Sequence, residues 1–247
     1  MDSDNTVARE WIRNKEDLFK FFETTDISKS SRIFKSLFFV NLNQKNSLER
    51  NALFFTDLEM TKYLLSKNKI DVNCKDFYGN NALFFSKSEK LKILVNAGSN
   101  INEVNFKGEN LLFFCNCNEK IKYLLENGVN KEQKDNAGKT PLFTVNNKDA
   151  LTLMVQYGCD INAKDYLGRN ALAYASPLML ESFIDLGIDL SIYPFDKKEL
   201  KLIFKDDERV DYIYEAKVKK IEHEKNIILE AMNDMPVKEK INYKKRL

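Results

Sequence analysis

A five-residue apolar segment recurs along this chain at an almost constant interval. NALFF occupies residues 51–55 and returns unchanged at 81–85, and the variant NLLFF follows at 110–114. Further versions are TPLF at 140–143 and NALAY at 170–174, so successive copies start 29 or 30 residues apart. Self-similarity at a fixed period in this range predicts a solenoid, in which similar structural units stack one on the next.

Each interval between two pentads carries the signals of a second helix and a turn. Apolar residues at i, i+3 and i+4 form one helical stripe, in the sets Leu91/Leu94/Val95, Ile121/Leu124/Leu125, Leu151/Met154/Val155 and Leu180/Phe183/Ile184. A glycine follows each stripe, at Gly98, Gly128, Gly158 or Gly187, where it can end a helix in the left-handed conformation. An extended piece then leads to a second glycine, which predicts a turn. One unit is therefore predicted to consist of a short helix, a loop, a longer helix and a β-like turn.

The pentad itself is predicted to be the short first helix of each unit. Its leading Asn or Thr is a good N-cap, and Pro141 fits the first helical position. A helix this short is marginal by itself. Its Leu and Phe side chains must therefore be buried against neighbouring units, so we expect a packing element rather than a binding motif.

Two segments of the chain resemble the ankyrin repeat family. GKTPLF at 138–143 is similar to the family's G-x-T-P-L-H, and GCDINAKDYLGRNAL at 158–172 is similar to its G-A-D-V-N-A-x-D-x-x-G-x-T. The resemblance covers about residues 48–193 and recurs in register five times. It implies an all-α ankyrin-repeat solenoid of helix–loop–helix–β-turn units, and a protein that binds other proteins through its turn tips.

The units depart from the family in two respects. They are shorter than the usual ankyrin repeat of about 33 residues, so the first helix is expected to be about a turn shorter. Phe54, Phe84, Phe113 and Phe143 stand where the family has His, and Ala173 takes that place in the last unit. In the family this His ties neighbouring turns by hydrogen bonds, which Phe cannot do. We therefore expect packing between units to replace polar tethering.

The flanking segments are predicted to cap the repeats. Residues 1–47 show helical apolar patterning, which indicates a helical N-terminal cap for the repeats at 48–195. A dedicated binding or secretion element is the alternative. Residues 196–235 predict one short and one long amphipathic helix at the other end, and the basic segment 236–247 is predicted to be a flexible tail.

The sequence offers little support for catalysis. It has no glycine pattern of a phosphate-binding loop, and its only histidine, His223, lies in a strongly charged predicted helix. Cys74, Cys115, Cys117 and Cys159 come from three different units, which disfavours a zinc site and favours free thiols. We expect a protein that is not an enzyme and needs no cofactor or metal; an enzyme built around His223 or the cysteines is the distant alternative.

Charge and hydropathy restrict the partners. A net charge of +2 gives no general attraction to nucleic acid or membranes. No apolar run approaches the roughly 20 residues that span a bilayer, and the N-terminus lacks the apolar core of a signal peptide. These features predict a cytoplasmic protein, monomeric when free, that binds neither nucleic acid nor membrane.

The turn tips vary from copy to copy and are therefore the predicted partner-binding residues. They are Phe77, Tyr78, Asn105, Phe106, Asp135, Asn136, Tyr166 and Leu167. Exposed aromatic side chains on adjacent tips are typical of interface hot spots, although the alternative is that some of them fold back onto the repeats. The leading hypothesis is a bacterial immunity protein that neutralises a toxin by binding it. The alternative is a secreted effector or viral host-range factor that binds a host protein.

Overall fold

The computed structural model describes residues 43–67, 70–204 and 207–234. They fall into two compact parts, each larger than one repeat, which we call the first unit and the second unit from here on. The first unit ends at Cys159 and the second begins at Asp160. Most of the predicted N-terminal cap and the whole of the predicted basic tail lie outside the described residues.

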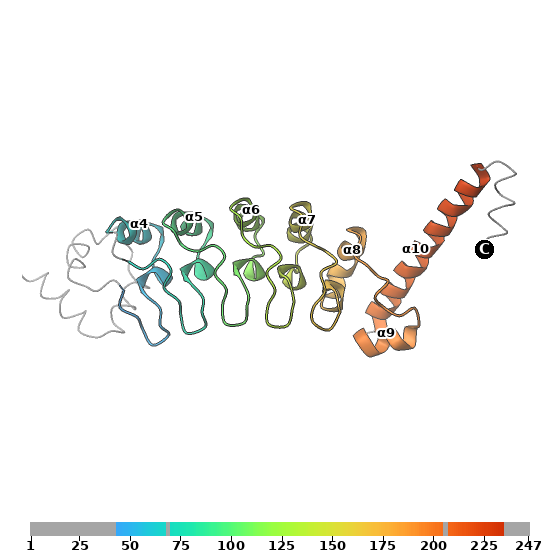
Figure 1. Cartoon of the computed structure of the whole chain (residues 1–247), viewed down its shortest axis with the longest axis horizontal. Coiled ribbons are helices and arrows are strands. Elements are labelled where there is room, and N and C mark those ends of the chain that lie inside the picture. The colour runs from blue at the N-terminus through green and yellow to red at the C-terminus, as the bar shows by residue number, and fades with distance from the viewer. Residues whose placement is uncertain (1–42, 68–69, 205–206, 235–247) are drawn as a thin grey trace, which may run out of the picture. The chain divides into compact units, whose positions relative to one another are not determined.

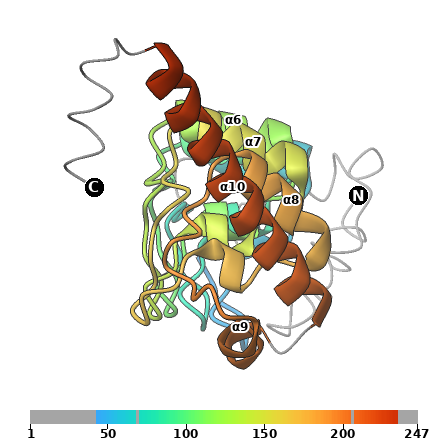
Figure 2. The ribbon, with the colours of Figure 1, turned by 90° about the vertical axis from the view of Figure 1, so that its right-hand side faces the viewer.

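The first unit is a row of four helix pairs, with the α-helices on one side and the turns on the other (Figures 1 and 2). Each pair consists of a short 3-10 helix and an α-helix of nine residues. The pairs are η3 (Ala52–Phe54) with α4 (Leu58–Ser66), η4 (Ala82–Phe85) with α5 (Ser88–Asn96), η5 (Leu111–Phe114) with α6 (Asn118–Glu126), and η6 (Pro141–Thr144) with α7 (Lys148–Gln156). The first helix of each pair is thus a 3-10 helix of a single turn, tighter than an α-helix.

The second unit contains one further pair and two longer helices. The pair is η7 (Ala171–Ala173) with α8 (Pro177–Asp185), and α9 (Lys197–Phe204) and α10 (Asp207–Asp234) follow. Within this unit α10 packs against both α8 and α9. The described residues form no strand, only one isolated bridge between Val104 and Asn110, so the predicted all-α fold is confirmed.

The leading Asn of the pentad makes two hydrogen bonds inside each pair. The Oδ1 atom of Asn51 accepts from the amide of Leu53 at 3.1 Å, and its Nδ2 atom donates to the carbonyl of Asp71 at 2.8 Å. The same two bonds occur at Asn81, Asn110 and Asn170. All four side chains are buried, so each Asn is an N-cap and also fixes the loop that leaves the α-helix.

Other polar side chains join one pair to the next. The amide of Asn100 donates to Asn73 Oδ1 at 2.7 Å, and the amide of Asn130 donates to Asn102 Oδ1 at 2.6 Å. In a second kind of link, the buried Lys90 Nζ donates to the carbonyls of Leu53 and Thr56 in the preceding pair. The expectation that packing replaces polar tethering is therefore right only in part, because polar ties from asparagine and lysine accompany the packing of Phe rings.

Aromatic packing does accompany these ties. The rings of Phe54 and Phe85, and those of Phe84 and Phe114, lie with their centroids 5.6 Å apart. Phe54, Phe113 and Phe143 are buried as expected, whereas Phe84 is only half-buried. Leucines at the pentad's third position and on the facing side of the α-helices fill the centre of each pair, among them Leu53, Leu64, Leu83, Leu94, Leu112, Leu124 and Leu142.

The pentad that starts with Thr140 lacks the two asparagine hydrogen bonds. Replacing Thr140 with Asn therefore measures how much these bonds stabilise the protein. The buried Thr140 Oγ1 atom has no hydrogen-bond partner among the described residues, and η6 has no side-chain cap. We expect Thr140→Asn to raise the free energy of unfolding by about 0.5–2 kcal/mol, because its Oδ1 atom can accept from the η6 backbone. Urea denaturation measures the change. The reverse exchange at a regular copy, Asn110→Thr, should destabilise by a similar amount; a stabilising Asn110→Thr would contradict this role.

Lys90 gives a pH-dependent prediction. Its Nζ donates to the carbonyls of Leu53 and Thr56 at 2.6 Å each, and burial lowers its pKa to about 8. In the unfolded chain Lys90 has its ordinary pKa of 10.5, and in the folded chain its pKa is about 8. Between these two pH values the unfolded chain therefore binds more protons than the folded chain. The free energy of unfolding therefore rises with pH in this interval through Lys90. Both bonds can persist in the neutral amine, which retains two N–H groups.

The Lys90→Met variant should lose this rise and, at pH 7, about 1–3 kcal/mol because two buried carbonyls lose their donor. Urea denaturation at several pH values compares it with the wild type. Lys62→Met removes an exposed lysine paired with Glu59 and is the matched control. An identical pH profile for wild type and Lys90→Met would refute the assignment.

Candidate protein-binding surface

The turns between pairs are held by one acidic or amide side chain each. Asp76 Oδ1 accepts from the amides of Tyr78 and Asn80, both at 2.9 Å. Asn105, Asp135 and Asp165 make the same pair of bonds to the residues two and four positions later. Such Asx turns fix the backbone locally, so the tips are rigidly presented.

Backbone hydrogen bonds also connect neighbouring turns of the first unit. The amide of Phe77 donates to the carbonyl of Leu48, that of Phe106 to Tyr78, and that of Asn136 to Lys107, at 2.8–2.9 Å. These bonds place exposed side chains from four turns next to one another. We call this the turn surface; it comprises Leu48, Phe77, Tyr78, Phe106 and Asn136.

The first of these turns was missed in the sequence. Asn46 Oδ1 accepts from the amides of Leu48 and Arg50, as Asp76 does in the next turn. Glu49 occupies the place of the turn glycine and takes its positive φ of 61°. Comparing NQKNSLERN with NCKDFYGNN would have found this turn, because only the missing glycine conceals it.

The predicted tip residues differ in their exposure. Phe77, Tyr78 and Phe106 are 63%, 55% and 72% exposed, and Phe77 and Tyr78 pack edge to face. Tyr166 and Leu167 are equally open, but they belong to the second unit. The structure therefore brings together the three aromatic tip residues of the first unit.

Two of the predicted contact residues, Asn105 and Asp135, hydrogen-bond within their own turns. Asn105 is buried, and its side chain bonds to two backbone amides and to Glu109. Asp135 is half-buried and closes its own turn in the same way. Asn136 is exposed, although its Nδ2 atom donates to the carbonyl of Phe106. That Asn105 and Asp135 contact a partner stays a prediction; in this structure both side chains hold their own turns.

The fifth pentad position adds exposed aromatic side chains that the sequence analysis had assigned to the core. Phe85 and Phe114 are 46% and 51% exposed. The Arg50 guanidinium lies over the Phe85 ring at 4.3 Å from its centroid, while Arg50 also bonds to the buried Asp76 carboxylate. The sequence does contain a sign that the fifth position is exposed. The third position is Leu in all five copies, whereas the fifth varies and is Phe, Phe, Phe, Thr and Tyr.

The described residues offer no evident catalytic chemistry. Burial raises the pKa of the Cys115 thiol to about 11 and that of Cys159 to about 12, which keeps both thiols protonated. His223 is exposed on α10. Within the ranges described, no group of three His, Cys, Asp or Glu side chains could hold a metal ion. None of the helices described is both long and apolar enough to cross a membrane.

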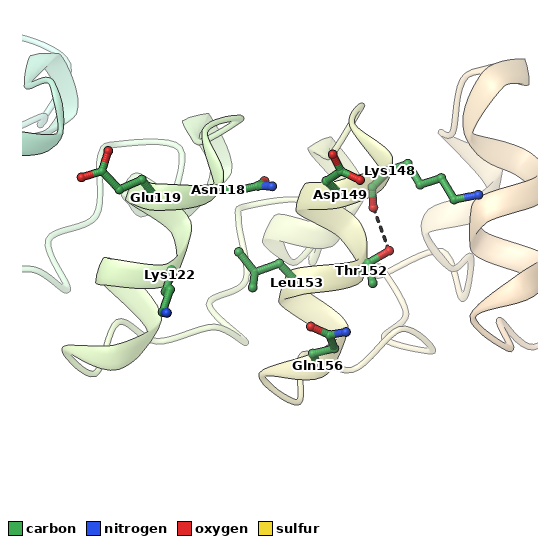
Figure 3. A pocket seen from close by; sticks show the side chains of 8 residues that line it. All are labelled: Asn118, Glu119, Lys122, Lys148, Asp149, Thr152, Leu153 and Gln156. Atoms are coloured by element: carbon green, nitrogen blue, oxygen red, sulfur yellow. Dashed lines mark hydrogen bonds between the residues drawn. The ribbon is translucent and has the colours of Figure 1, made fainter.

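A hollow of about 350 Å³ lies between α6 and α7 on the helical side of the row (Figure 3). Glu119 and Lys122 border it from α6, and Lys148 and Asp149 border it from α7. These four side chains are exposed and carry both signs of charge. Small-molecule sites are concave, mostly apolar and have few polar groups, so this hollow lacks their character.

The helix pairs and turns define an all-α repeat protein. A family model for ankyrin repeats, in three copies, matches residues 85–165, so this part of the chain consists of ankyrin repeats. The five pairs described extend the same pattern beyond the matched residues on both sides.

One solved structure illustrates the likeness of the fold. It is described as the predatory endopeptidase Bd0816 from Bdellovibrio bacteriovorus in complex with the immunity protein Bd3460. The matched chain is 22% identical with a TM-score of 0.58, over 68% of this chain and 96% of that chain. At this identity the match concerns the fold. No curated protein matches the sequence.

Gly79 tests whether the turn surface is preorganised. Its φ is +83°, and a Cβ atom there would lie 2.9 Å from Phe106 Cδ1 and 3.0 Å from the Phe106 amide nitrogen. At Gly128, where φ is +80°, a Cβ atom would meet nothing within 4 Å. Gly128→Ala should cost about 1–2 kcal/mol from backbone strain alone. Gly79→Ala should cost roughly 1–3 kcal/mol more, because Phe106 and its backbone must move. Equal losses in urea denaturation would mean that Phe106 does not pack on Gly79.

Proposed function

We propose that this protein binds another protein through the turn surface, and that binding itself is its action. The observation that carries the proposal is the set of exposed aromatic side chains Phe77, Tyr78 and Phe106 on turns that are hydrogen-bonded to each other. Large aromatic side chains supply much of the energy of protein interfaces. Turns held in place before binding lose little conformational entropy on association.

The aromatic side chains at the fifth pentad position extend this proposal. Phe85 and Phe114 lie on the 3-10 helices, adjacent in sequence to the turns. A partner that covers the turn tips and also contacts Phe85 would meet the Arg50 guanidinium stacked on that ring. The partner surface is therefore proposed to be largely apolar at its centre.

Among possible partners, we favour a toxic enzyme made by the same cell, which this protein would neutralise by covering it. Two observations support this choice. The described residues carry no evident catalytic or metal-binding group, so covering a partner is the simplest output. The solved structure with a similar fold is described as a complex of an endopeptidase with an immunity protein. The proposal includes action in the cytoplasm by a monomer that needs no cofactor.

Affinity purification from the native source, followed by mass spectrometry, tests the partner's class. A hydrolase or other toxic enzyme of the producing cell is the expected result, and the purified pair should show the enzyme inhibited. A host protein as the captured partner would instead establish the effector alternative. An enzyme that remains fully active in the complex would contradict neutralisation.

Alanine substitutions test the surface. Phe77→Ala, Tyr78→Ala and Phe106→Ala should each weaken partner binding by about tenfold or more, because they remove central aromatic contacts. Their melting temperatures should change little, since all three side chains are mostly exposed. Isothermal titration calorimetry with the captured partner measures the affinity.

Two controls make this result interpretable. Leu178→Ala removes an exposed apolar side chain on α8 and should leave the affinity unchanged. Phe113→Ala removes a buried ring and should cost about 3–5 kcal/mol of stability. If the three tip variants behaved like Phe113→Ala, they would be core residues and the interface would lie elsewhere.

A further inference from the structure

The guanidinium of Arg50 is held at one edge and open at the other. Its Nε and Nη2 atoms both donate to Asp76 Oδ2, at 3.1 and 2.9 Å. Within the part of the chain that the structure describes, its Nη1 atom makes no hydrogen bond and is not among the buried unpaired side-chain atoms. The Nη1 atom therefore reaches the surface. Because a guanidinium carries five N–H groups in a fixed fork, Arg50 retains a second donor edge, formed by Nη1 and Nη2.

The charges around Arg50 make this edge positive towards the solvent. The side chain of Asp76 has no exposed surface, whereas that of Arg50 is 18% exposed. Asp76 Oδ1 is already occupied, because it accepts from two backbone amides of its own turn. The neighbouring Glu49 pairs with Lys45 instead, with Oε2 and Nζ 3.4 Å apart. These four groups carry no net charge together, but the positive member of the Arg50–Asp76 pair faces water while the negative member is buried.

Two aromatic rings support the guanidinium. The Arg50 Cζ atom lies 4.3 Å from the centroid of the Phe85 ring and 5.6 Å from that of Phe54. Phe54 is buried, and nearly half of the Phe85 surface is exposed. The rings shield part of Arg50 from water, and charges attract each other more strongly where water is excluded. An arginine that is already held by Asp76 and by the rings also loses little freedom when it binds.

The corresponding position of the last pair also carries an arginine, but its edge is occupied. The Nε and Nη2 atoms of Arg169 lie 3.0 Å from the buried Asp165 Oδ2, and its guanidinium lies over the Tyr174 ring. Its Nη2 atom also donates to the Tyr174 hydroxyl. Arg169 therefore cannot offer two parallel N–H groups at the edge that is open in Arg50. The three copies between them have other residues at this position: Asn80, Glu109 and Lys139.

We propose that Arg50 binds a carboxylate of the partner protein, from an Asp or Glu side chain beside the apolar centre of the partner's surface. The Nη1–Nη2 edge donates two parallel hydrogen bonds to the two carboxylate oxygens, which is the strong geometry of this pair. Apolar neighbours of the acidic residue contact Phe85. A phosphate group fits less well, because Asp76 already neutralises Arg50 and the second negative charge of the phosphate stays uncompensated. This inference rests on the function proposed above and adds to it a residue that selects the partner.

Nuclear magnetic resonance of the full chain, labelled with ¹⁵N, tests the site without the partner. Benzoate is the probe, because it joins a carboxylate to a ring that can contact Phe85, and the neutral benzamide is its control. The Nε–H resonance of Arg50, identified by its loss in Arg50→Lys, should shift progressively with benzoate and hardly with benzamide. The Phe85 amide should respond to benzoate in the wild type and not in Arg50→Lys. Equal shifts with both probes, or larger shifts with inorganic phosphate, would overturn the carboxylate assignment.

Two matched variants connect the site to the captured partner. Arg50→Lys keeps the charge and a donor for Asp76 but loses the forked edge, so it should weaken partner binding by about tenfold or more. Arg169→Lys makes the same exchange where Tyr174 occupies the edge, and it should leave the affinity unchanged. Both variants are measured at temperatures at which circular dichroism shows them folded. A purely structural Arg50 would change the melting temperature but neither the benzoate response nor the affinity of the folded protein.

The outcomes separate this inference from the proposed function. If Phe77→Ala weakens partner binding and Arg50→Lys does not, the turn surface binds the partner and the role of Arg50 is wrong. If only Arg50→Lys weakens it, the carboxylate site holds and the aromatic turn tips lose their role. If neither weakens it, both proposals fail. Equal losses with Arg50→Lys and Arg169→Lys would show that the open edge is not what the partner recognises.

Discussion

The buried asparagine at the head of each pentad is the interaction on which the rest of the structure depends. Its side-chain amide offers one acceptor and one donor, and both are used for backbone groups that would otherwise be buried without a partner. Leaving such groups unpaired costs more than the bond itself contributes. Each Asn therefore fixes the start of a 3-10 helix and the end of the loop about 20 residues later. A side chain that must meet both requirements is difficult to replace, which explains why the chain repeats it four times in five copies.

Because these asparagines hold the backbone, the side chains at the turn tips are not needed to stabilise the fold. Asn links such as that of Asn73, and the Asx residues such as Asp76, hold the backbone, so the side chains between them can vary. Phe77, Tyr78 and Phe106 stabilise little by burial, because most of their surface remains in water. Aromatic side chains in such places are costly for solubility unless a partner covers them. A turn backbone that hydrogen bonds hold rigid, together with exposed apolar side chains, makes a surface suited to binding.

Much of the fold could be predicted because its signals are local. The period of 29 or 30 residues, the glycines with positive φ and the helical stripes each act within a few residues. It was harder to predict which positions of the pentad are buried and which are exposed. In a 3-10 helix a turn takes about three residues rather than 3.6, so the fourth and fifth positions face differently: Phe113 is buried while Phe114 is exposed. The same limit explains Asn105, whose side chain could serve a turn or a partner equally well on sequence alone. The three-dimensional geometry shows the turn role, because two backbone amides donate to its Oδ1 atom.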